Sequence, residues 1–410
     1  MSDLQSPSKF HNFLNIAKAN MRNYTMFLIL GLIMLGFAIL TDGVNFHPRN
    51  FTYIFIQNSY ILILAIGMIL IIIVGDIDLS VGSLSGFLGA ISVIIYNNLG
   101  FGFVPTIILT ILIGLAIGAF MGYWVAYVNI PAFIVTLAGM FLFRGLTYII
   151  TNVTPITPRT QIFKDMASGT VDFLKINTMA ANSNGEMVQQ AFQPLPIIIG
   201  ILIILYMVFS GIKDRKNKIK NDFTILPIGY FITQQVFFAA ILMLLCVKFA
   251  QYRGLPNVFA ILGITAIIFM FITRSTVFGR YIYAVGGNAR SAKLSGINSE
   301  KVKFLVHVIM GGICGLAGVV FTGYMNSALP DAGKDFELEA IAACYIGGAS
   351  AAGGVGTIIG AIMGGLVMGV INNGMSLMNI GANWQYVVKG SVLLLAVWYD
   401  VYTRKKAGLA

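Results

Sequence analysis

Two carboxylates lie within a stretch of sequence that is otherwise almost entirely apolar. Asp76 and Asp78 occur in "VGDIDLSVGS" (74–83), which begins at the last residue of the apolar run "ILILAIGMILIIIV" (61–74). A charged side chain at the centre of a membrane-spanning helix costs roughly 2.5–3.5 kcal/mol on insertion scales, so this pair is not expected to face lipid. Intramembrane carboxylates indicate a gate on a substrate path or a buried structural motif, and the residue types leave both open.

A break between two helices would position the two carboxylates away from lipid. We expect one helix to end near Gly75 and the next to begin after Asp78. Asp78 can then cap free N–H groups of the second helix, where the helix dipole favours negative charge. Asp76 is free to take partners from neighbouring segments. We therefore assign Asp76, Asp78 and Ser80 to a substrate path or gate, with a cap-and-pack motif as the alternative.

A second candidate element is the run of small residues "AIAACYIGGASAAGGVGTIIGAIMGG". Small residues let helix backbones approach closely, and they also suit a path for polar solutes; both roles remain open. Glu337 and Glu339 precede the run in the first turn of a helix, where the dipole favours them and where they can accept hydrogen bonds from sugar hydroxyls. The segments 74–91 and 346–363 resemble each other weakly as Gly-rich breaks. The candidate path residues here are Glu337, Glu339, Gly347, Gly348 and Ser350.

A third candidate element is the polar segment 275–303. Asn288 is a good N-cap residue, "ARSAKLS" is a short helix, and Gly296 suits the position that follows a helix. A docking element is favoured over an ordinary solvated loop, which would leave apolar surface exposed at Tyr281, Tyr283, Val285, Leu294 and Ile297. The residues assigned to it are Gly286, Gly287, Asn288, Arg290, Lys293, Leu294, Ser295, Gly296 and Ile297.

Other kinds of chemistry lack support. The sequence contains no G-x-x-x-x-G-K-[ST] phosphate-binding loop, no spacing typical of a metal site and no nucleophile–base pair, so no catalytic or metal-ligating residue is assigned. The three cysteines lie in or beside apolar stretches and are expected to be buried packing residues. The net charge of +11 does not imply nucleic acid, because an excess of Lys and Arg in a membrane protein usually marks cytoplasmic loops.

Composition predicts an all-α polytopic membrane protein. Of the 410 residues, 58% are hydrophobic and 10% are charged, against about 25% charged in soluble domains. Apolar runs predict about twelve transmembrane segments, since a span needs about 20 residues. They lie near 24–42, 51–74, 79–97, 104–128, 132–152, 196–212, 224–247, 256–274, 303–325, 337–350, 354–376 and 386–402. The segment 337–350 is short and is expected to be a half-length helix.

The basic residues orient this arrangement. They concentrate in 1–23, 213–222, 275–303 and 403–410, which places both termini in the cytoplasm and leaves the polar segment 153–195 outside. The expected organisation begins with a cytoplasmic segment 1–23, followed by helices one to five in 24–152 and an external insert 153–195. A transmembrane pair in 196–247 comes next, then helices eight to twelve in 248–402 with the cytoplasmic loop 275–303, and a basic cytoplasmic tail 403–410.

Four motifs in order resemble those of the membrane permease subunits of ribose/xylose/galactose-type ABC importers. They are "GDIDLSVGS", "VGGNARSAKLSGI", "ELEAIAACYIGGASAAGGVGT" and "WQYVVKGSVLLLAV", and the resemblance covers 51–152 and 256–406. The C-terminal part looks most like the xylose and multiple-monosaccharide branch. The pair 196–247 and the insert are additions to the ten-helix core of the shortest family members.

The resemblance implies partners and a mechanism. It implies a permease homodimer in a prokaryotic plasma (inner) membrane, an ATPase with two fused nucleotide-binding halves that holds ATP and Mg²⁺, and an extracytoplasmic sugar-binding protein. The segment 286–297 would be the coupling helix that docks on the ATPase. The chain would form a monosaccharide path by alternating access, with no cofactor and no enzymatic activity of its own. The alternatives are an ion-coupled secondary transporter that uses Asp76 and Asp78, a membrane-embedded enzyme, and the same importer role with a nucleoside or other furanosyl cargo.

Overall fold

Most of the described chain is helical and apolar. The computed structural model describes residues 26–171, 176–181, 187–221, 223 and 227–406. The expected cytoplasmic segment 1–23 lies outside them, as do the last four residues of the basic tail. Within the described residues, nine helices are long and apolar enough to cross a membrane. They are α2 (Pro48–Ile73), α3 (Val81–Asn98), α4 (Phe103–Ala126), α5 (Ala132–Thr151), α7 (Leu195–Lys220), α8 (Ile228–Ala250), α9 (Asn257–Ser275), α12 (Ser299–Met325) and α14 (Ile358–Leu377).

The other three predicted spans are also helical but differ from these nine. The apolar helix Met26–Leu40 and α13 (Phe336–Ile346) are shorter, and α15 (Ala382–Lys406) contains Lys389 and Asp400 within its length. At 1.5 Å per residue α13 is about 16 Å long, which is half of a normal span. The structure thus confirms a polytopic helical protein and the half-length helix, whereas the number of spans and the position of the termini remain predictions.

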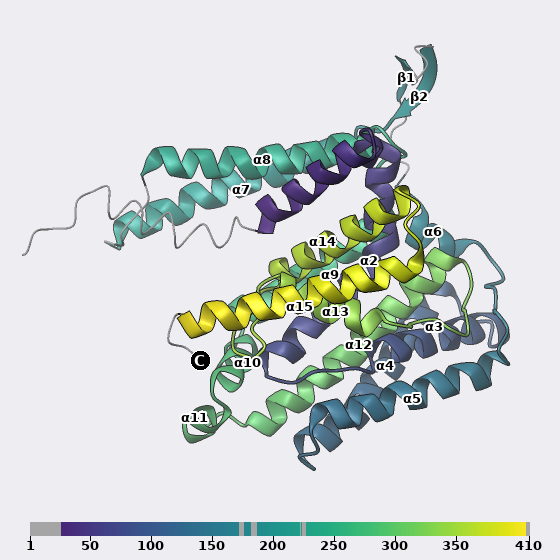
Figure 1. Cartoon of the computed structure of the whole chain (residues 1–410), viewed down its shortest axis with the longest axis vertical. Coiled ribbons are helices and arrows are strands. Elements are labelled where there is room, and N and C mark those ends of the chain that lie inside the picture. The colour runs from purple at the N-terminus through teal and green to yellow at the C-terminus, as the bar shows by residue number, and fades with distance from the viewer. Residues whose placement is uncertain (1–25, 172–175, 182–186, 222, 224–226, 407–410) are drawn as a thin grey trace, which may run out of the picture. The chain divides into compact units, whose positions relative to one another are not determined.

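One compact unit comprises residues 26–31, 46–52 and the described residues between 170 and 255. In it α7 and α8 lie side by side, and α7 continues as a helix through the basic segment that the sequence suggested was a loop (Figure 1). Strands β1 (Ile176–Ala181) and β2 (Met187–Phe192) pair antiparallel, with Ile176 opposite Phe192. This hairpin in the insert departs from the expectation of an all-α chain.

A second unit comprises residues 32–45, 53–169 and 256–406. It contains the short helix α6 (Ile162–Ser168), and α12 packs against both α3 and α4 in it (Figure 1). The short helix η1 (Val44–Phe46) lies where the chain passes between the two units. Glycines bring the backbones together: a Cβ on Gly114 would overlap Gly311 O, and one on Gly318 would overlap Ser85 O. Such close approach lets helices associate through van der Waals contact, without a hydrophobic driving force.

The polar segment between α9 and α12 is more ordered than a loop. It folds into α10 (Val277–Gly287) and α11 (Ala289–Leu294). The Thr276 side chain accepts a hydrogen bond from the Gly279 N–H and so caps α10. Helix α10 was not predicted, although Thr276 is a suitable N-cap residue. Gly279 in its first turn lowers the helix propensity of the run. Ile282 and Val285 are buried, which shows that α10 packs into the second unit.

Candidate functional site: a polar junction at the helix breaks

The break at "GDIDLS" has the expected form. Helix α2 ends at Ile73 and α3 begins at Val81. Gly75 adopts a φ of 88°, which a residue without a Cβ reaches readily. The Gly75 N–H donates to Ile72 O and the Asp76 N–H donates to Ile71 O, so the end of α2 is satisfied by a Schellman-type turn.

Asp78 organises the entry into α3 but does not cap the helix itself. Its Oδ1 accepts hydrogen bonds from the Ser80 N–H at 2.8 Å and from Ser80 Oγ at 2.6 Å. Ser80 precedes the first helical residue and makes no side-chain cap, so the motif is an Asx turn that leads into α3. The predicted cap on the helical N–H groups is therefore replaced by a turn that fixes the approach to the helix.

Asp76 takes a partner from a distant segment, as expected. Its Oδ1 pairs with Lys303 Nζ of α12 at 2.7 Å. The Asp76 side chain is only 9% exposed, and its Oδ2 is buried with no hydrogen-bond partner in the described part of the chain. Because Asp76 is largely shielded from water, its attraction to Lys303 is screened less than that of a surface pair, and the ion pair connects α12 to the break.

The short helix in the third candidate element is confirmed, with different bounds. Asn288 Oδ1 accepts from the Ser291 N–H at 2.9 Å and caps α11, and Gly296 follows the helix with a φ of 83°. Gly286 and Gly287 belong to the end of α10 rather than to the docking helix, because Asn288 ends one helix and begins the next. The apolar residue on α11 that needs a partner is Leu294, which is 84% exposed.

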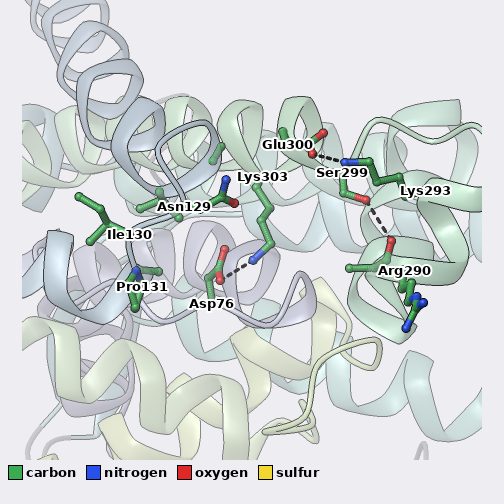
Figure 2. A pocket seen from close by; sticks show the side chains of 13 residues that line it. Asp76, Asn129, Ile130, Pro131, Arg290, Lys293, Ser299, Glu300 and Lys303 are labelled. Atoms are coloured by element: carbon green, nitrogen blue, oxygen red, sulfur yellow. Dashed lines mark hydrogen bonds and ion pairs between the residues drawn. The ribbon is translucent and has the colours of Figure 1, made fainter.

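A pocket connects α11 with the "GDIDLS" break. It has a volume of about 430 Å³. Figure 2 shows Lys303 reaching from α12 to Asp76, with the ion pair between Lys293 and Glu300 nearby. The lining side chains come from the break, the α4–α5 turn, α11 and the start of α12. They are Asp76, Val125, Ala126, Asn129, Ile130, Pro131, Ala132, Ala289, Arg290, Lys293, Ser299, Glu300 and Lys303.

The two Gly-rich breaks meet the end of α10. The Gly354 N–H donates to Ile73 O at 2.9 Å, and a Cβ on Gly286 would overlap Ile73 O and approach Gly354 N. Tyr283 Oη donates to Gly356 O at 2.8 Å. Burial raises the pKa of the Tyr283 hydroxyl, so it stays protonated as a donor at neutral pH. All three elements from the sequence analysis thus converge on one junction.

The small-residue run packs tightly, as one of its two interpretations required. A Cβ on Gly347 would overlap Gly360 O of α14, and Gly348 adopts a φ of 87° at the turn after α13. Ser350 is buried, and its N–H donates to Val355 O at 3.0 Å. These contacts explain the small residues by packing alone, and a role in a substrate path stays a prediction.

The two glutamates of α13 have different surroundings. Both lie in its first turn, as expected. Glu339 forms an ion pair with Lys389 of α15. Glu337 is 5% exposed, and its Oε2, which lies against the backbone of Gly82, has no hydrogen-bond partner among the described residues. Glu337 is therefore a buried carboxylate with an open acceptor.

Two residues of the junction were not singled out from the sequence. Lys303 was grouped with the basic residues of a loop, and Tyr283 was treated as apolar surface. A signal for Lys303 exists, because a lysine at the start of a long apolar helix is expected to seek a carboxylate. The described residues contain no group of three or more His, Cys, Asp or Glu that could hold a metal.

Replacing Asp78 should separate the effect of its hydrogen bonds from that of its charge. Asp78→Ala removes both acceptor bonds and the charge, whereas Asp78→Asn removes the charge but keeps an oxygen for Ser80. We expect Asp78→Ala to be less stable than Asp78→Asn by about 1 kcal/mol. The melting temperatures of the two purified variants in one detergent provide the test, and equal values would show that these bonds do not stabilise the break.

Comparison with known proteins agrees with a transport role. A family model described as "Branched-chain amino acid transport system / permease component" matches residues 50–397. The xylose transport system permease protein XylH of Haemophilus influenzae is 38% identical over 391 residues, which is 95% of this chain and 99% of that protein. XylH of Escherichia coli K12 is 38% identical over 397 residues, 96% of this chain and 95% of that protein.

A relative with lower sequence identity is also a sugar permease. The ribose import permease protein RbsC of E. coli K12 is 30% identical over 373 residues, which is 91% of this chain and 92% of that protein. No solved structure matches the chain. The chain belongs to this family of transport-system permease components. It is a multi-pass membrane subunit of a transporter and not an enzyme on its own.

Proposed function

We propose that this chain is the membrane permease of an ATP-driven, binding-protein-dependent importer of a monosaccharide, in a prokaryotic inner membrane. The similarity to XylH over nearly the full length of both proteins carries this proposal. It favours a sugar over the amino acids in the description of the family model. A pentose such as xylose is the first candidate, because the xylose permeases are more similar in sequence than the ribose permease.

The partners follow from the same proposal. An ATPase with two fused nucleotide-binding halves binds ATP and Mg²⁺. It docks on α11, where the exposed side chains of Leu294, Arg290 and Lys293 are suited to contact another protein. An extracytoplasmic binding protein delivers the sugar, and a second copy of the chain completes the path. The basic end of α7 and the polar segment around α11 then face the cytoplasm, in keeping with the positive-inside rule.

An ion-coupled transporter would use the carboxylates of the break differently. A cation site needs carboxylate oxygens that are free to bind and release an ion. Asp76 is engaged by Lys303, and Asp78 accepts two hydrogen bonds from Ser80. These contacts support a structural or gating role over ion coupling.

Reconstitution tests the source of energy. Permease alone in liposomes should not accumulate xylose or ribose under a proton or sodium gradient, because no ATPase is present to move α11. Liposomes that also contain the ATPase, with ATP inside the lumen on the same side as the ATPase and binding protein on the opposite side, should accumulate the sugar. Gradient-driven uptake by permease alone would contradict the proposal, and radiolabelled sugar uptake is the measurement.

A further inference from the structure

Lys303 lies where two polar links of the permease meet. We propose that Lys303 is a positioning residue that transmits movement of α11 to the break between α2 and α3 through its ion pair with Asp76. This inference rests on the proposed function, in which an ATPase moves α11. It adds a connection between the docking helix and the broken helix.

The first link joins α11 to the start of α12. Ser299 Oγ donates to Ala289 O at 3.3 Å, which ties the first residue of α12 to the first residue of α11. Lys293 Nζ pairs with Glu300 Oε1 at 2.7 Å across the same gap. Because these two links lie on successive residues of α12, a displacement of α11 is expected to carry the first turn of α12 with it.

The second link joins α12 to the break. Lys303 is one turn beyond Ser299 and pairs with Asp76 at 2.7 Å. His307 is one turn further, it is 2% exposed, and its Nδ1 is 2.9 Å from Lys303 O. His307 also interacts electrostatically with Asp78. Residues on consecutive turns of α12 therefore interact with the two carboxylates of the break.

The partners of Asp76 make this link specific. Three other charged side chains line the pocket: Lys293 and Glu300 pair with each other, and Arg290 forms no ion pair with Asp76 among the described residues. Asp76 Oδ2 has no hydrogen-bond partner among the described residues, so Lys303 is its only charged partner there. Asp76 lies in the non-helical segment 74–80, next to Gly75 with its positive φ. Such a segment can change its backbone conformation more easily than a continuous helix, so it can move with Lys303.

A fluorophore in the break measures this coupling without reference to the cargo. Ile77 is 37% exposed, and the three native cysteines are buried, so Ile77→Cys gives a selective labelling site. The permease–ATPase complex is placed in lipid nanodiscs, and the change in fluorescence on addition of ATP with vanadate is recorded. Lys303→Met, Asp76→Asn and the charge-swapped Asp76→Lys/Lys303→Asp are compared in this background. Lys301→Met is the matched control, because it removes an exposed lysine from the same turn of α12.

The relay predicts a distinct pattern of responses. The fluorescence change should fall about fivefold or more in Lys303→Met and Asp76→Asn, as expected for a lost coupling between sites. It should persist in Lys301→Met and in the conservative Lys303→Arg, and it should return in the swapped double variant. Every response is scaled to the amount of ATPase bound, so lower yield of folded complex does not imitate a lost relay.

Three outcomes would overturn the inference. The first is no fluorescence change in the labelled Ile77→Cys complex that retains Asp76 and Lys303. The second is an unchanged fluorescence change in Lys303→Met, and the third is a double variant as unresponsive as the single variants. If Lys303→Met does not fold, the fluorescence changes of Asp76→Asn and Lys303→Arg are compared instead. Equal changes in these two variants would also overturn the inference. Import of labelled xylose and ribose is measured separately. Failure of import with an intact fluorescence response would count against the proposed cargo and not against the relay.

Discussion

Replacing Ala292 with proline is expected to release the permease from its ATPase while leaving the permease in the membrane. Ala292 lies inside α11 and is 5% exposed, and its N–H donates to Asn288 O at 2.9 Å. Proline removes this bond and clashes with the preceding turn, which costs about 3 kcal/mol within a helix. The membrane spans are untouched, so association with the ATPase and sugar-stimulated ATP hydrolysis should fall together.

Ala289→Pro is the matched control for this experiment. Ala289 is the first residue of α11, where proline is well tolerated because that N–H has no helical partner. Asn288 before it has a φ of −161° and a ψ of 101°, which is compatible with a following proline. Co-purification with the ATPase measures docking. Normal stoichiometry and normal hydrolysis in Ala292→Pro would exclude α11 as the docking element and direct attention to the basic end of α7.

Adding a single methyl group at Gly286 should disrupt the junction of the two breaks. A Cβ at this position would overlap the carbonyl oxygen of Ile73 and lie 2.8 Å from the Gly354 nitrogen. Both are backbone atoms, so no side-chain rotation relieves the clash, and either α10 or the breaks must move apart. Overpacking of this kind costs about 1–3 kcal/mol, and here it also separates three elements of the site.

Gly287→Ala provides the comparison at the neighbouring position. A Cβ on Gly287 meets no atom within 4 Å, so this substitution adds the same methyl group to the same helix end without a clash. Gly286→Ala should lower the melting temperature and the sugar uptake of the reconstituted transporter relative to Gly287→Ala. Similar stability and uptake in the two variants would show that the contact between α10 and the breaks is not required.

Local features of the site were predictable because they depend on neighbours in the sequence. Gly75 ends α2 with a positive φ, as its lack of a Cβ allows. Asn288 caps α11 and Gly296 follows it, since short polar side chains and glycine favour these positions. The half-length α13 was also expected, from the length of its apolar run. Each of these involves interactions within a few residues.

Predictions failed where packing competes with local preference. Residues 277–287 were expected to form part of a loop, but they form α10 because Ile282 and Val285 are buried against the rest of the unit. Asp78 was expected to cap α3, but its oxygen is taken by the N–H and hydroxyl of Ser80, two residues away. Two-strand pairing in the insert was likewise not evident from residue types.

The sequence by itself determined the class of this protein: a chain of apolar spans interrupted by two Gly-rich breaks and one capped polar helix. These properties follow from helix length, hydropathy and capping, which act over short distances along the chain. Only the tertiary structure decided that Asp76 pairs with Lys303, which is 227 residues away, and that Gly286 lies against Ile73 and Gly354. Charge pairing and backbone approach at such separations depend on how the helices pack, and residue types alone do not specify the partner.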